Sequence, residues 1–193
     1  MVRLMRFLLP LVLAGLVSCG PGKTVPEPVP ALPVRQVERL FPVPFFPTRE
    51  TQIEGRPVAD LAPGWTAASL YGEDHLSPDQ KAWVATLEPA GGEGLVSPGF
   101  TKDFDHDGKK ETVSFGAWAR GRDEGNFVLV TREGSTPPEV LLLKELPGPP
   151  RFTVFTLKTD GSLWFGGGVD AGEVTMKLSW DTGRPVFNLL TQD

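Results

Sequence analysis

The sequence predicts a mainly β protein, an antiparallel sheet or small sandwich with one short helix, preceded by a disordered Pro-rich tether. The chain of 193 residues contains 22 glycines and 20 prolines, a composition that favours turns and extended segments over long helices. Short runs of β-branched and aromatic residues, separated by turn residues, fill the C-terminal half. Half of the prolines lie between residues 20 and 63, which predicts the tether. The length leaves room for one domain.

Residues 1–18 have the layout of a signal peptide, which is removed and takes no part in the fold. Arg3 and Arg6 form a positively charged start, and the apolar segment at 7–16 is too short to span a membrane. The following stretch, LVSCG at residues 16–20, resembles the lipobox of bacterial lipoproteins. This resemblance implies cleavage before Cys19 and attachment of a diacylglyceryl group to its thiol. An ordinary secretory signal with an incidental cysteine is the alternative.

The lipid anchor implied by this resemblance places the protein in the cell envelope, with the membrane as partner through acyl chains, such as palmitate, on Cys19. Gly20 follows the cysteine where an inner-membrane lipoprotein has aspartate, which favours the outer membrane if the host has one. Loss of Arg3 and Arg6 changes the formal charge from −5 to −7. No basic stripe remains that could neutralise phosphates, so no nucleic-acid partner is expected.

The Pro-rich segment at 19–63 predicts a polyproline-like tether that leads to a β-rich domain at 64–193. Within it, residues 34–41 can form a helical turn. Three aromatic residues are too apolar for a purely solvated linker, and we expect them to dock on the domain, with a partner protein as the alternative. They are Phe41, Phe45 and Phe46.

A helix is predicted at 78–88. Ser77 can cap it, and Gln80 occupies the reciprocal position of a capping box. Pro78 suits the first helical position, and Pro89 ends the helix. The apolar face that we expect to meet the core consists of Trp83, Val84 and Leu87.

The C-terminal half predicts an antiparallel β region. Its strands are expected at 112–119, 127–132, 140–144, 152–157, 163–165, 174–180 and 186–190. Residues 173–180 alternate apolar and polar side chains, which indicates one buried and one solvated face. The sequences at 160–161 and 181–183 suit hairpin turns. The glycines at 166–168 indicate a bulge or a close backbone approach.

The acidic stretch at 103–111 is the one place where residue types and spacing together indicate a particular chemistry. Its acidic residues are Asp103, Asp105, Asp107 and Glu111. Carboxylates about 4–5 Å apart repel by roughly 3–4 kcal/mol per pair at an effective dielectric constant near 20. A hard cation relieves this repulsion, and calcium suits best because it accepts about 6–8 oxygen ligands in flexible geometry. Gly108 supplies the positive φ of a sharp turn, and Lys109 can offer its backbone carbonyl.

The residues after the acidic stretch distinguish between two kinds of calcium loop. An EF-hand requires glutamate six positions after the glycine, where Ser114 stands, and 112–118 has the pattern of a strand. The stretch instead resembles the loop-then-strand calcium motif of FG-GAP and VCBS-type repeats. This resemblance implies calcium ligands at Asp103, Asp105, Asp107 and Glu111.

The acidic stretch occurs once in the sequence, so a complete propeller of FG-GAP or VCBS-type repeats is excluded. The alternative to a calcium site is a solvated acidic turn. In that alternative the offsetting charges are those of Lys102, Lys109 and Lys110.

The leading hypothesis for function is a lipid-anchored, calcium-stabilised binding or structural module of the cell envelope, without catalysis, whose partner is an envelope protein or a glycan. The first alternative is a carbohydrate-binding protein with Trp118 and Trp164 as the candidate ligand platform. The second is an envelope hydrolase with two carboxylates about 5–9 Å apart. Trp83 and Trp180 lie on apolar faces, and we expect them in the core.

Overall fold

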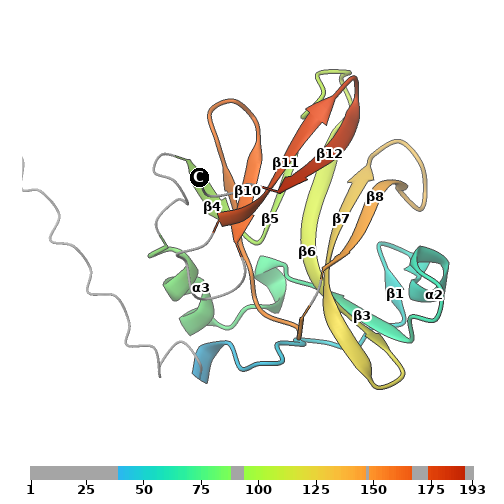
Figure 1. Cartoon of the computed structure of the whole chain (residues 1–193), viewed down its shortest axis with the longest axis vertical. Helices are drawn as coiled ribbons and strands as arrows, with labels where there is room; N and C mark the ends of the chain where they lie inside the picture. The colour runs from blue at the N-terminus through green and yellow to red at the C-terminus, as the bar shows by residue number, and fades with distance from the viewer. Residues whose placement is uncertain (1–38, 88–93, 147, 167–173, 190–193) are drawn as a thin grey trace, which may run out of the picture. The chain divides into compact units, whose positions relative to one another are not determined.

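The computed structural model describes residues 39–87, 94–146, 148–166 and 174–189. They form a mainly β fold with antiparallel sheets and two short α-helices, which confirms the predicted fold class (Figure 1). All seven predicted strands are present, with small shifts at their ends. The predicted signal peptide, Cys19 and the rest of the chain up to residue 38 lie outside the described residues.

The first large sheet is built on a long hairpin of β6 (Glu111–Arg120) and β7 (Asp123–Arg132). β8 (Glu139–Leu146) pairs with β7. On its other side β6 pairs with β3 (Ala67–Leu70) near the turn and with β5 (Gly99–Lys102) at the far end. At that far end the register sets Glu111 opposite Arg132.

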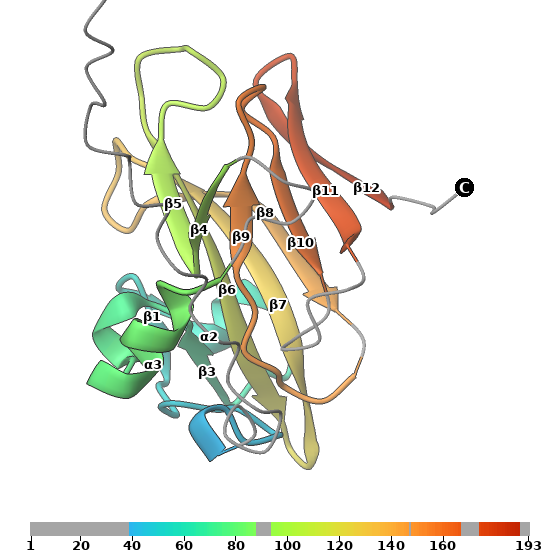
Figure 2. The ribbon, with the colours of Figure 1, turned by 90° about the vertical axis from the view of Figure 1, so that its left-hand side faces the viewer.

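The second large sheet has the strand order β12, β11, β10, β9, β4, and Figure 2 shows these strands side by side. Their bounds are β4 (Leu95–Ser97), β9 (Phe155–Leu157), β10 (Leu163–Gly166), β11 (Val174–Asp181) and β12 (Arg184–Leu189). The predicted turns at 160–161 and 181–183 join β9 to β10 and β11 to β12. The register of β10 shifts between Phe165 and Gly166, which confirms an irregularity at the start of the glycine run.

The two large sheets pack face to face through aromatic side chains. The ring of Phe115 on β6 lies 5.1 Å from Phe155 and 5.2 Å from Phe165 in the second sheet. The opposite face of β6 carries Trp118, which stacks on Trp65 at 5.8 Å. The central hairpin is therefore buried on both faces, so its buried residues run almost without interruption.

Residues 39–63 belong to the folded body, which corrects the predicted boundary at 63. Phe41 is 1% exposed and stacks on Phe152 at 4.2 Å. The backbone of Phe45 bonds Pro150 and accepts from the Tyr71 hydroxyl. The docking of Phe41 and Phe45 is thus confirmed, and a tether that extends to 63 is wrong. Proline has no backbone N–H to donate to a neighbouring strand, but its apolar ring can still be buried. A Pro-rich segment that contains aromatic residues can therefore cover a core.

Residues 52–61 add three small elements that the sequence did not indicate. They are β1 (Gln52–Ile53), β2 (Arg56–Pro57) and α2 (Val58–Leu61). Ile53 and Val58 are buried against the outer face of the first sheet, together with Trp65 and Trp118. The three elements are too short to be stable alone, so their order depends on this packing.

Helix α3 (Pro78–Val84) has the predicted capping box, with both reciprocal bonds between Ser77 and Gln80 present. It follows a 3₁₀ turn, η1 (Glu73–His75), and ends at Val84, not at 88. Trp83 is buried against Phe41 and Phe152, as expected for the core face. No helix among the described residues is both long and apolar enough to cross a membrane.

Candidate metal centre

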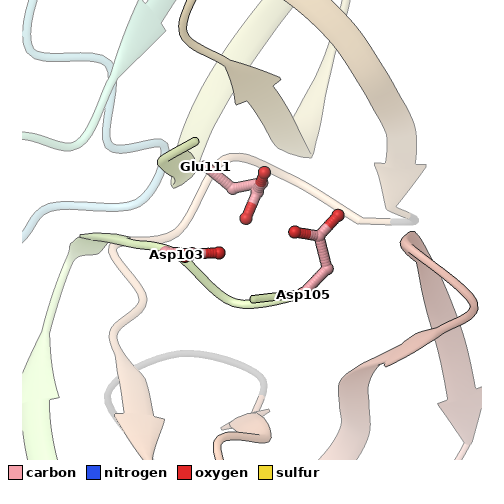
Figure 3. Close-up of side chains that lie close together, drawn as sticks. All are labelled: Asp103, Asp105 and Glu111. Atoms are coloured by element: carbon pink, nitrogen blue, oxygen red, sulfur yellow. The ribbon is translucent and has the colours of Figure 1, made fainter. Parts of the chain in front are cut away.

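The loop between β5 and β6 brings three of the predicted ligands together. Asp103, Asp105 and Glu111 each present a carboxylate oxygen, and these oxygens lie within 4.8 Å of one another. Figure 3 shows the three carboxylates converging on one point. Glu111 is the first residue of β6 and is fully buried. This cluster could hold a metal ion.

The loop folds around its own carboxylates. The Gly108 amide donates to Asp103 Oδ2 at 3.1 Å, and the Asp107 amide donates to Asp105 Oδ1 at 3.1 Å. Gly108 has φ of 89°, which is the positive value that the sequence predicted. The Phe104 amide donates to Glu111 Oε2 at 2.9 Å and so ties the loop to the start of β6.

The remaining two predicted ligands, Asp107 and Lys109, have other contacts. Asp107 is not part of the group of three, and its Oδ1 accepts from the Lys109 amide at 2.8 Å. Its other oxygen lies 3.7 Å from a nitrogen of Arg132. Lys109 was predicted to contribute its backbone carbonyl; its side chain is exposed, as is that of His106. The structure therefore brings together part of the predicted ligand set.

Arg132, at the end of β7, is the residue of this site that the sequence did not reveal. Its Nε donates to Glu111 Oε1 at 2.9 Å, and its Nη2 donates to Asp105 Oδ2. The hydrogen bond to Glu111 and the charges of the neighbouring carboxylates raise the pKa of Arg132, so its guanidinium stays charged. Only the hairpin register, which sets Glu111 opposite Arg132, could have indicated this contact.

One guanidinium does not neutralise the site. Asp103, Asp105, Asp107 and Glu111 carry four negative charges, against one positive charge on Arg132. Asp103 Oδ1 is buried, and no described residue donates a hydrogen bond to it. A buried carboxylate oxygen without a donor is costly, and a cation between the three carboxylates would relieve that cost.

The same loop is attached to the second sheet. The ring of Phe104 stacks on Trp180 of β11, with centroids 4.3 Å apart and planes at 5°. Arg132 Nη2 also donates to the Gly183 carbonyl in the β11–β12 turn at 3.3 Å. A Cβ at Gly183 would lie 3.3 Å from Asp105 Oδ2, so glycine permits this close approach. The carboxylate cluster therefore lies where the two sheets are joined.

The candidate ligand platform of Trp118 and Trp164 is not formed. Trp118 is 8% exposed, stacks on Trp65, and donates from Nε1 to the Asn126 carbonyl at 3.0 Å. It faces the core because residues 52–65 cover that side of β6. Trp164 is half-buried in the other large sheet, where its Nε1 donates to Ser162 Oγ at 3.0 Å. The two rings therefore cannot present one exposed surface.

Comparison with protein family models, with curated proteins and with solved structures yields no match to this chain. A fold alone would not specify an activity, because one fold hosts many unrelated functions.

Proposed function

We propose that this protein is a lipid-anchored module of the cell envelope whose β fold carries one structural calcium ion at Asp103, Asp105 and Glu111. The observation that carries the proposal is the convergence of these three carboxylates, one of which has an oxygen, Asp103 Oδ1, that is buried without a donor among the described residues. The donor set consists of oxygens alone, which favours a hard cation such as calcium, magnesium or manganese over zinc or copper. The likeness of 103–111 to FG-GAP and VCBS-type calcium loops supports calcium.

A structural role fits the site better than a catalytic one. A substrate would have to reach the ion, yet Glu111 is fully buried and the Asp105 side chain is 3% exposed. Both carboxylates are also held by Arg132, which opposes their rearrangement around a substrate. A catalytic metal site keeps an open coordination position and a general base nearby, whereas the carboxylates of Asp105 and Glu111 are buried and bonded to Arg132.

Calorimetric titration of the full chain with calcium tests the metal site. Extracellular calcium modules bind with a Kd of about 10⁻⁴–10⁻³ M, and we expect a value in that range. Asp103→Asn should abolish the binding heat, whereas Asp74→Asn, an exposed aspartate of η1, should leave it unchanged. No binding heat at millimolar calcium, or equal binding by both variants, would refute the calcium site.

The anchoring half of the proposal rests on the LVSCG motif at 16–20. Residues 20–38 would then form the tether, which at about 3.1 Å per residue reaches roughly 60 Å when fully extended. Cys19→Ser should move the protein from the membrane fraction to the soluble fraction. If the variant stayed with the membrane, the lipid would have no part in the function.

A further inference from the structure

A pocket of about 160 Å³ lies beside the acidic loop, between it and the second sheet. Phe104 and His106 of the loop line one side, and Trp180 of β11 lines another. The size of the pocket suits a small ligand or one terminal group of a larger one.

Positively charged side chains outnumber negatively charged ones in the lining of this pocket. Lys102 and Lys177 line it, and its one carboxylate is that of Asp160. Lys177 Nζ lies 3.4 Å from Asp160 Oδ2, so these two charges offset each other. No described carboxylate lies within ion-pair distance of Lys102 Nζ. The pocket therefore has a surplus positive charge in a chain whose net charge is −5.

Asp160 has little capacity left for a ligand. Its Oδ1 accepts from the Ser162 amide at 2.9 Å and from Ser162 Oγ at 2.6 Å. These bonds lower the pKa of Asp160, which keeps it ionised and paired with Lys177. The groups that remain for a ligand are mainly donors, notably the ammonium of Lys102, so the ligand that fits is rich in acceptors.

We propose that this pocket binds a small oxyanion, a carboxylate or a phosphate group, and that it binds the anion more tightly when calcium occupies the neighbouring loop. The inference rests on the proposed calcium site. Without a cation, the four loop carboxylates outnumber the positive charges of Arg132, Lys109 and Lys110 by one, which leaves a net charge of −1 beside the pocket and disfavours an anion. A bound calcium ion would change that charge to +1.

The coupling has a mechanical part as well. Phe104 stands between two ligands of the proposed site, Asp103 and Asp105, and its ring both lines the pocket and stacks on Trp180. An ion that fixes the two aspartates therefore also fixes one wall of the pocket. His106, in the same loop, lines the pocket and has a positive φ of 62°.

The test is an NMR titration of the full chain in nonionic detergent at constant ionic strength. Acetate and methyl phosphate are titrated separately, with calcium present at about ten times its measured Kd and after its removal by dialysis. The signals observed are the amides of Lys102 and Phe104 and the indole of Trp180. We expect saturable shifts with at least one of the two anions, and the anion with the lower Kd identifies the ligand group.

Variants separate this pocket from general charge effects. Lys102→Gln should raise the anion Kd by up to about fivefold, the range of an exposed ion pair, and Lys102→Arg should restore it. Lys81→Gln, which removes the same charge from exposed α3, should have no effect. Saturable shifts that Lys81→Gln weakens equally would overturn the proposal, because they would report charge alone.

The remaining outcomes distinguish the two proposals. Calcium binding without saturable shifts from either anion would overturn the pocket and leave the calcium site intact. Anion binding that is equal with and without calcium would overturn the coupling. Absence of calcium binding in the calorimetric titration would overturn the calcium site and the coupling, and the anion titration without calcium would then test the pocket by itself.

Discussion

Two regions of this molecule join segments that are far apart in the sequence, and they do so by different physics. In the aromatic cluster of Phe41, Phe45, Tyr71, Trp83 and Phe152, the N-terminal segment meets helix α3 and the approach to β9 through apolar rings. In the acidic loop, β5, β6 and the β11–β12 turn meet through carboxylates and one guanidinium. The aromatic cluster needs nothing from solution, whereas the acidic loop retains unbalanced negative charge.

We therefore expect the aromatic cluster to join its segments in any solution, whereas the stability of the acidic loop should depend on a bound cation. Burial of apolar surface stabilises the aromatic cluster at any ionic composition. If the proposed calcium site is correct, the acidic loop gains stability that grows with the logarithm of the calcium concentration above the Kd. Substitutions in the two regions should therefore differ both in size and in their response to calcium.

The largest effect is expected from Phe41→Ala in the aromatic cluster. Phe41 is buried and stacks on Phe152, so truncation should lower the free energy of unfolding by about 3–5 kcal/mol. Val43→Ala in the same segment is the control, because Val43 is 53% exposed and should change stability by less than about 0.5 kcal/mol. Urea denaturation measures both. Similar losses in the two variants would mean that residues 39–46 do not contribute to the core.

Arg132→Met tests the acidic loop. It leaves buried Glu111 without its charged donor, which should cost about 2–3 kcal/mol in calcium-free solution. Calcium can take over part of the role of the lost guanidinium, so its stabilising effect should be larger in this variant than in the wild type. Thermal unfolding with and without calcium measures the difference. An unchanged calcium effect would show that Arg132 and the ion do not share these carboxylates.

The sequence predicted the parts of the fold that depend on local pattern. The strands at 112–119 and 174–180 follow from alternation, and the capping box of Ser77 and Gln80 follows from local hydrogen bonding. It did not predict β3 at 67–70 or β5 at 99–102, whose short runs become strands only because β6 offers them a pairing edge. Long-range pairing is not encoded in a local window, so these strands were missed.

The site was predictable to a similar degree. The convergence of Asp103, Asp105 and Glu111 followed from spacing within one loop. Arg132 was missed because its contact depends on the hairpin register, and Trp118 was misassigned because the covering segment at 52–65 was expected to be a tether. Both errors concern partners that are distant in the sequence.

Tyr71 allows the aromatic cluster to be tested by pH. Burial raises the pKa of its hydroxyl above the usual value near 10, and the hydroxyl donates to the Phe45 carbonyl. The folded state therefore keeps the proton that the unfolded state loses, so stability is complete below pH 10 and falls by about 1.4 kcal/mol for each pH unit above it. Tyr71 is the sole tyrosine, so tyrosinate absorbance reports it alone. Ionisation near pH 10 without unfolding would mean that the cluster is open to water.

The smallest effect is a local one, the change in hydrogen exchange on addition of calcium. With a Kd of about 10⁻⁴–10⁻³ M, roughly 1 mM calcium contributes about 0.4–1.4 kcal/mol, which slows exchange through local opening about two- to tenfold. The slowing should appear at the Phe104, Gly108 and Lys109 amides, which donate to loop carboxylates. The Phe45 amide, which donates to Pro150 in the aromatic cluster, serves as the internal control. If calcium slowed all four amides equally, the ion would be stabilising the whole fold. The acidic loop would then depend on the cation no more than the aromatic cluster does.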